Sequence, residues 1–161
     1  MALLDTGQVI QYVVGETRPR RVIVGAVLGM LGLASGAFLL GLDVGLGDFA
    51  GGWLLVALGI ALIAGLRRAG LGPTVGALWL IALWLFVFPP LVGYLTGEWA
   101  MASRYTHPRM MGFGYTSARA ELIGGLEYGL QFGLFFAVVP GTMAYVVGSL
   151  INRFWNRFEP V

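Results

Sequence analysis

Four long apolar runs dominate the chain, and most of its charged residues stand between the runs. They cover residues 22–42, 48–66, 74–95 and 122–151. An α-helix needs about 20 mostly apolar residues to cross the ~30 Å hydrocarbon core of a bilayer. The pattern therefore predicts an all-α integral membrane protein with four transmembrane helices. All four belong to one polytopic domain, residues 1–161.

Shorter segments flank these runs. Residues 1–17 carry an apolar face that includes Val13 and Val14, and the residues after Arg153 include Phe154, Trp155 and Phe158. Both segments are predicted to be short amphipathic elements at the membrane interface. Proline lacks a backbone N–H, so Pro89-Pro90 is predicted to break or kink the third span and Pro140 to bend the fourth.

One connection is long. Residues 96–121 link the last two spans and hold four aromatic residues and the single histidine, His107. Long connections without secondary structure are uncommon and are often functional. The aromatic residues predict that this loop folds onto the bundle.

Arginine positions predict how the chain is threaded. Cytoplasmic loops carry an excess of basic residues. With four spans, one side holds seven of the ten arginines: Arg18, Arg20, Arg21, Arg67, Arg68, Arg153 and Arg157. We therefore expect a multi-pass protein of the cell (plasma) membrane with both termini in the cytoplasm and the loop 96–121 outside. The absence of lysine favours a GC-rich prokaryotic genome.

Composition agrees with a membrane protein and excludes several functions. The chain is 58% hydrophobic and 11% charged, where a soluble domain carries about 25% charged residues. The net charge of +2 comes from arginines beside apolar spans, so no basic patch for nucleic acid is expected. The expected partners are the lipid bilayer and either other copies of the chain or other membrane subunits. With no cysteine, disulfides and thiolate metal sites are excluded.

Catalytic residues are scarce. Hydrolysis by a nucleophile needs a base and a group that orients it. Ser103 or Ser117 would combine with His107, but no aspartate lies on that loop. His107, Glu98 and Glu121 would be the ligands of a metal, yet their spacing is not typical of a metal site. We therefore expect no enzyme activity, no metal and no cofactor.

Glycines form two stripes at helical spacing. In membrane helices such stripes permit close approach of a neighbouring helix. The sequence leaves open whether that neighbour belongs to the same chain. The first stripe lies in the first span and the second in the last: Gly25, Gly29, Gly32 and Gly36, then Gly125, Gly129 and Gly133.

Polar residues form a stripe on the last span, on the side away from its glycines. At 100° per residue they fall within an arc of about 60°: Glu127, Gln131, Thr142, Tyr145 and Ser149. A carboxylate at the depth of Glu127 is costly in lipid. It would pair with Arg109 or Arg119, become protonated, or line a wet cavity that binds a cation or proton.

Three functions fit this pattern. The leading hypothesis is an accessory or assembly subunit that packs on partner helices through its glycine stripes and does no chemistry. The alternative is a homo-oligomeric channel or small transporter lined by the polar stripe. The third is a membrane enzyme or lipid-binding protein with a site under the loop 96–121.

Overall fold

The protein is an all-helical bundle. The computed structural model describes residues 13–42, 44, 50–98, 104–108 and 115–158. Within these ranges there is no strand, and four helices are assigned: α2 (Thr17–Leu39), α3 (Ala50–Leu66), α4 (Leu71–Thr96) and α5 (Ala118–Phe158). Of the amphipathic segment predicted near the N-terminus, only Val13 and Val14 among its apolar residues are described, and both are helical. Residues 1–12 lie outside the described part.

Three helices, α2, α4 and α5, are long and apolar enough to cross a membrane. The fourth, α3, is apolar but has 17 residues, or about 25 Å at 1.5 Å per residue. Compared with the predicted spans, α4 and α5 are longer at both ends, α2 begins five residues earlier and ends three residues earlier, and α3 lies within its predicted span. α2 begins at Thr17, with Pro19 in its first turn, where the N–H groups have no helical partner in any case. α5 continues past residue 151 to Phe158, so the predicted interfacial tail is part of one helix.

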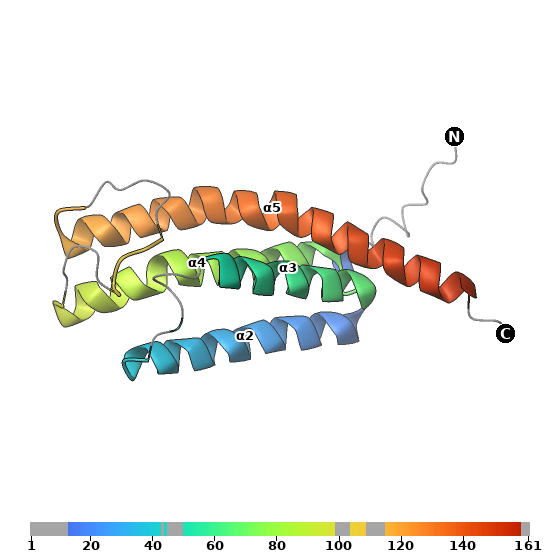
Figure 1. Cartoon of the computed structure of the whole chain (residues 1–161), viewed down its shortest axis with the longest axis horizontal. Helices are drawn as coiled ribbons and strands as arrows, with labels where there is room; N and C mark the ends of the chain where they lie inside the picture. The colour runs from blue at the N-terminus through green and yellow to red at the C-terminus, as the bar shows by residue number, and fades with distance from the viewer. Residues whose placement is uncertain (1–12, 43, 45–49, 99–103, 109–114, 159–161) are drawn as a thin grey trace.

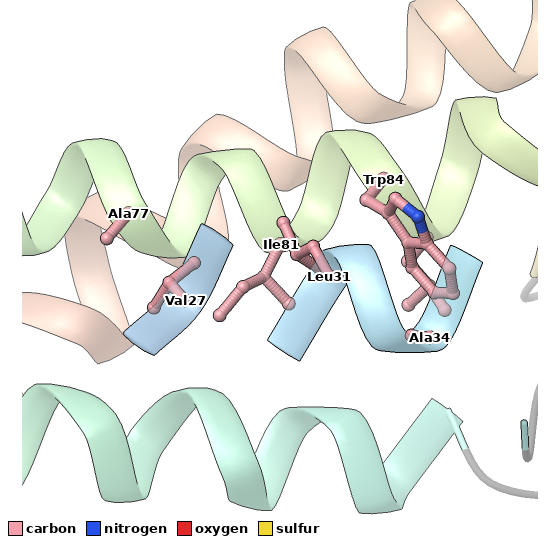
Figure 2. Close-up of a cluster of buried hydrophobic side chains, with 7 residues drawn as sticks. Val27, Leu31, Ala34, Ala77, Ile81 and Trp84 are labelled. Carbon is pink, nitrogen blue, oxygen red and sulfur yellow. The ribbon is translucent and has the colours of Figure 1, made fainter. Parts of the chain in front are cut away.

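α4 forms the centre of the bundle. α5 lies along α4 and α3, and α2 lies on the other side of α4 (Figure 1). α2 meets α4 through Val27 and Leu31, which pack with Ile81 and Trp84 (Figure 2). Trp84 Nε1 donates to Ser35 Oγ at 2.8 Å, and Ser35 Oγ donates to Leu31 O at 2.8 Å. The polar groups of this apolar contact are therefore paired with each other.

The proline pair does not end α4. The helix runs through Pro89 and Pro90 to Thr96, so of the two predicted outcomes the break is wrong and the kink stays a prediction. Pro90 cannot donate to the carbonyl four residues earlier, which belongs to Phe86. The backbone of α5 comes so close there that a Cβ on Gly125 would overlap Phe86 O. The Cα–H of Gly125 thus meets the freed carbonyl, a weak but recurring contact between packed helices.

The two ends of the bundle differ. The start of α2, the end of α3 and the end of α5 lie at one end, which we call the arginine end (Figure 1). There the N–H of Glu16 donates to Arg68 O at 3.1 Å. α4 and α5 are joined by residues 97–117 at the other end, which we call the connection end.

Candidate functional site

The connection between α4 and α5 enters the bundle. Tyr105 packs over Gly93 of α4 and lies edge-on to Phe38 of α2, with ring centroids 5.9 Å apart. Two residues later, the His107 ring lies 6.3 Å from the Phe86 ring. Phe86 precedes Gly93 by seven residues, or about 10 Å along α4. The segment 104–108 therefore descends between the helices, as its aromatic residues predicted. Irregular backbone at this depth is tolerated where protein covers it.

A buried acid receives this segment. Glu121 is fully buried and His107 is 2% exposed. Oε1 of Glu121 accepts the backbone N–H of His107 at 3.0 Å and lies 2.7 Å from His107 Nδ1. One carboxylate oxygen thus contacts both the main chain and the ring of the same residue, which fixes the position of the connection and the orientation of the imidazole.

The start of α5 explains why a carboxylate is stable at this position. Ser117 precedes the first helical residue, and its Oγ accepts the N–H of Ala120 at 3.2 Å as an N-cap. Glu121 lies in the first turn, where the helix dipole favours a negative charge. The acid therefore has favourable contacts with the connection and a favourable place on its own helix.

Aromatic rings surround the histidine. The His107 centroid lies 5.6 Å from that of Tyr115 and 5.3 Å from that of Tyr128, in addition to the contact with Phe86. Tyr115 fits against Gly124, which has no side chain to occupy that space. These rings shield the pair from both water and lipid, and in such surroundings a polar pair is worth more than at a surface.

Arg104 and Tyr105 hold the connection at two further points. The Arg104 guanidinium lies 4.3 Å from the centroid of the Phe38 ring and donates to Phe38 O near the C-terminus of α2. A cation is favourable there because the last carbonyls of a helix carry partial negative charge. The Tyr105 hydroxyl donates to Glu98 Oε2 at 2.9 Å. This hydrogen bond to Glu98 raises the pKa of Tyr105 above 10.0.

The contacts indicate that these residues anchor the connection. Ser117 Oγ is used as a helix cap, and Ser103 lies outside the described residues. Glu98 bonds Tyr105 instead of joining His107 and Glu121. In the described part of the chain no three metal-ligating side chains come together. What the site offers is a buried carboxylate that accepts the backbone N–H of a histidine, lies against its ring, and so holds the loop in the bundle.

The sequence singles out Glu127 as the carboxylate within the last span that needs a partner. The carboxylate that the structure buries is that of Glu121. A signal for this existed. Glu121, Gly125, Gly129 and Gly133 are spaced by four, so Glu121 shares the helix face of the glycines. All four are buried. The glycine stripe is predicted to pack against a helix. Glu121 lies on the same face of α5, so its burial follows from the same contact.

The structure divides the predicted polar stripe into two parts. Glu127 and Gln131 are exposed on the outside of the chain. Among the described residues neither carboxylate oxygen of Glu127 has an ion-pair or hydrogen-bond partner. Arg119, one of its two expected partners, is exposed and forms no described ion pair. Arg109, the other, lies outside the described residues.

The other members of the stripe face the bundle. Tyr145 is 4% exposed and packs with Ile23, Ala64 and Ala69. Ser149 Oγ donates to Gly65 O at 3.4 Å, and Thr142 is half-buried. The buried residues of α5 continue at four-residue spacing, and each step of four adds about 40° to a full turn. The contact line therefore winds around α5, so Glu127 and Tyr145 point the same way but only Tyr145 is covered.

The two glycine stripes also have different surroundings. The α5 stripe meets α4: a Cβ on Gly129 would lie 3.2 Å from Leu83, and one on Gly133 would lie 2.9 Å from Ala82. Trp79 Nε1 adds a hydrogen bond to Gly129 O at 3.2 Å. The α2 stripe meets nothing in the described chain. No atom lies within 4 Å of the Cβ position at any of its members: Gly25, Gly29, Gly32 and Gly36.

Comparison with known proteins adds no further assignment. No family model, curated protein or solved structure matches the chain.

Proposed function

We propose that this protein is an accessory or assembly subunit that packs on helices of other membrane subunits and does no chemistry of its own. In this proposal all four helices cross the plasma membrane and both termini lie in the cytoplasm. The arginines at the arginine end support that orientation through the positive-inside rule.

The observation that carries the proposal is the open glycine stripe of α2. The residues of α2 that face the bundle are Ile23, Val27, Leu31, Ala34 and Phe38. At 100° per residue, the mean direction of its four open glycines is about 170° away from theirs. The stripe thus faces directly outward, where a second helix could approach closely. The glycine stripe of α5 shows such a close approach within the chain, because it packs directly against α4.

The exposed polar residues Glu127 and Gln131 of α5 support the same function. A charged side chain that lacks a polar partner costs about 2.5–3.5 kcal/mol at the centre of a spanning helix, which is an upper limit for Glu127. Glu127 lies nine residues after the start of α5, about 13 Å along the helix axis. A partner helix carrying a donor would remove that cost. Because α2 and α5 lie on opposite sides of α4 (Figure 1), the subunit would contact two neighbours.

Substitution of one stripe glycine tests the proposal. Gly29→Leu places a bulky side chain on the stripe, whereas Gly76→Leu makes the same change in open space on α4. After extraction in mild detergent, native mass measurement should show the wild type and Gly76→Leu in a larger assembly and Gly29→Leu released from it. A wild-type monomer, or an assembly that persists in Gly29→Leu, would contradict the proposal.

A homo-oligomeric channel is the second candidate, because the unpaired Glu127 and Gln131 would face an axis shared by several copies. Tyr145 and Ser149 pack on α3, so only part of the polar stripe is available to line a pathway. Ion or proton flux into liposomes distinguishes the two functions. A channel predicts flux that Glu127→Gln lowers, and an assembly subunit predicts none.

A further inference from the structure

A long apolar groove lies between α3, α4 and α5. It has a volume of about 310 Å³ and is open to the surroundings along one side. α4 supplies the floor, with Leu78 and Ala82, and the walls come from α3 and α5, with Ala57 and Phe136. This volume is at the lower end of the ~300–1,000 Å³ typical of pockets that hold small ligands. We call this feature the wedge groove.

Helix crossing creates the wedge groove. Near the arginine end, α3 and α5 are in backbone contact: a Cβ on Gly148 would overlap Leu62 O, and a Cβ on Gly65 would overlap Tyr145 O. Toward the connection end these two helices bound the groove on either side of α4. The space between them is thus closed at one end by the glycine contact.

The connection covers the other end of the groove. Pro108 lines it beside Tyr128. Pro108 directly follows His107, which Glu121 holds in the bundle through two contacts. Along α5 the groove extends from Tyr128 to Ala137, nine residues or about 13 Å. The site is therefore a slot of limited length parallel to the helices.

The limited length and the apolar lining of the wedge groove determine what kind of molecule can bind in it. A spanning helix of another subunit must run through the whole membrane, but the glycine contact and Pro108 bound the groove at its two ends. A polar solute would find almost no partners, since only Trp53 and Tyr128 on its walls carry polar groups. Trp53 Nε1 already donates to Val44 O at 3.1 Å. A flexible apolar chain that enters sideways from the bilayer meets none of these obstacles.

We propose that one acyl chain of a membrane phospholipid binds in the wedge groove, parallel to α4 and α5. The chain fills space between α3 and α5 that their own side chains leave open, so it contributes the dispersion contacts that an empty groove lacks. This inference does not depend on a partner subunit and goes beyond the proposed function.

Photolabelling in vesicles tests the proposal without any substitution. The probe is a phosphatidylglycerol with a diazirine near the end of one acyl chain, mixed into phosphatidylglycerol–phosphatidylethanolamine vesicles that contain the full-length protein. General contact with lipid would follow exposure and would favour α2, where Leu33 is 79% exposed. A bound chain should instead give at least fivefold more label on the groove residues Ala57, Leu58 and Ala137 than on Leu33 or on Leu55, which is 71% exposed on α3 but does not line the groove. Label that follows exposure would overturn the proposal.

A variant pair provides the second test. Ala57→Leu adds three carbons inside the groove, and Ala26→Leu adds the same three carbons on the exposed surface of α2. Ala57→Leu should reduce labelling of Phe132–Ala137 at least fivefold, and Ala26→Leu should leave it unchanged. Equal labelling in both variants would refute the site. So would a photoreactive residue at Leu54 that captures another protein chain in native membranes instead of lipid.

Discussion

Replacement of Glu121 by alanine should release the connection from the bundle. Oε1 of this buried side chain is the acceptor for the backbone N–H of His107 and the contact of its Nδ1. Alanine removes both contacts and leaves two buried nitrogen groups without the carboxylate. A buried donor that loses its acceptor costs its desolvation free energy, about 1–3 kcal/mol.

The expected size of the effect follows from the hydrogen bond itself. A bond to a charged acceptor stabilises by about 1.5–3 kcal/mol, and each 1.4 kcal/mol is a factor of ten, so the His107 amide should exchange about 10- to 150-fold faster in Glu121→Ala. Glu121→Gln replaces the carboxylate by a neutral amide of the same shape, whose oxygen can still accept the His107 N–H. A neutral bond is worth about 0.5–1.5 kcal/mol, so this variant should show about a fivefold to tenfold increase.

Hydrogen exchange of the His107 amide, followed by mass spectrometry in lipid nanodiscs, measures this effect. Glu127→Ala and Glu127→Gln are matched controls, since they make the same changes six residues later on an exposed, unpaired side chain. Exchange in both controls should equal that of the wild type. The reasoning fails if Glu121→Ala leaves the protection of the amide unchanged, or if the Glu127 variants lose it equally.

Three further expectations concern contacts elsewhere in the bundle. Because the hydrogen bond to Glu98 raises the pKa of Tyr105, the stability that this bond contributes should be complete below pH 10 and lost as pH rises through the raised pKa. The ionisation of Tyr105 is followed by tyrosinate absorbance, with Tyr105→Phe as the blank, and it should occur at lower pH in Glu98→Gln than in the wild type. An unshifted titration would contradict the assignment. Gly148→Ala forces a methyl group against Leu62 O and should lower the stability of the fold by about 1–3 kcal/mol in thermal unfolding. Gly59→Ala, in open space on α3, should not lower it. Equal melting temperatures of the two variants would contradict the close contact between Gly148 and Leu62. Trp84→Phe removes the donor to Ser35 Oγ together with some buried ring surface. Its cost in the same assay should be smaller by about 0.5–1.5 kcal/mol in a Ser35→Ala background, because only the hydrogen-bond part depends on Ser35.

The three long helices and the closely packed side of α5 were accessible from the sequence because each depends on local spacing. Length and hydropathy identify α2, α4 and α5 without any knowledge of their neighbours. The glycine stripe of α5 likewise predicts a close helix contact, and α4 provides it. The predicted third span, residues 74–95, already passed through Pro89 and Pro90, but its local spacing could not show what the carbonyl freed by Pro90 would meet, since Gly125 comes from a different helix.

The buried pair was harder to predict because it joins a loop to a helix start. Nothing in the spacing of His107 and Glu121, fourteen residues apart, indicates that the loop turns back into the bundle. The division of the polar stripe into exposed and buried residues was hard to predict for a related reason. A fixed angle of 100° per residue describes directions around one helix, but burial follows the line of contact with neighbours, and on α5 that line winds with the four-residue spacing.

The open glycines of α2 make no close contact within the described part of the bundle, and glycine is a costly residue for a position that needs no close contact. In a helix interior, glycine is less favourable than alanine by about 0.8–1.0 kcal/mol, so four of them cost about 3–4 kcal/mol. On α5 the glycines allow backbone contacts with α4 that any side chain would prevent. On α2 no contact within the described chain offsets the same cost, and alanine would fit every one of the four positions. The proposed partner helix would lie against that face, where close packing would supply the contacts that the chain alone does not.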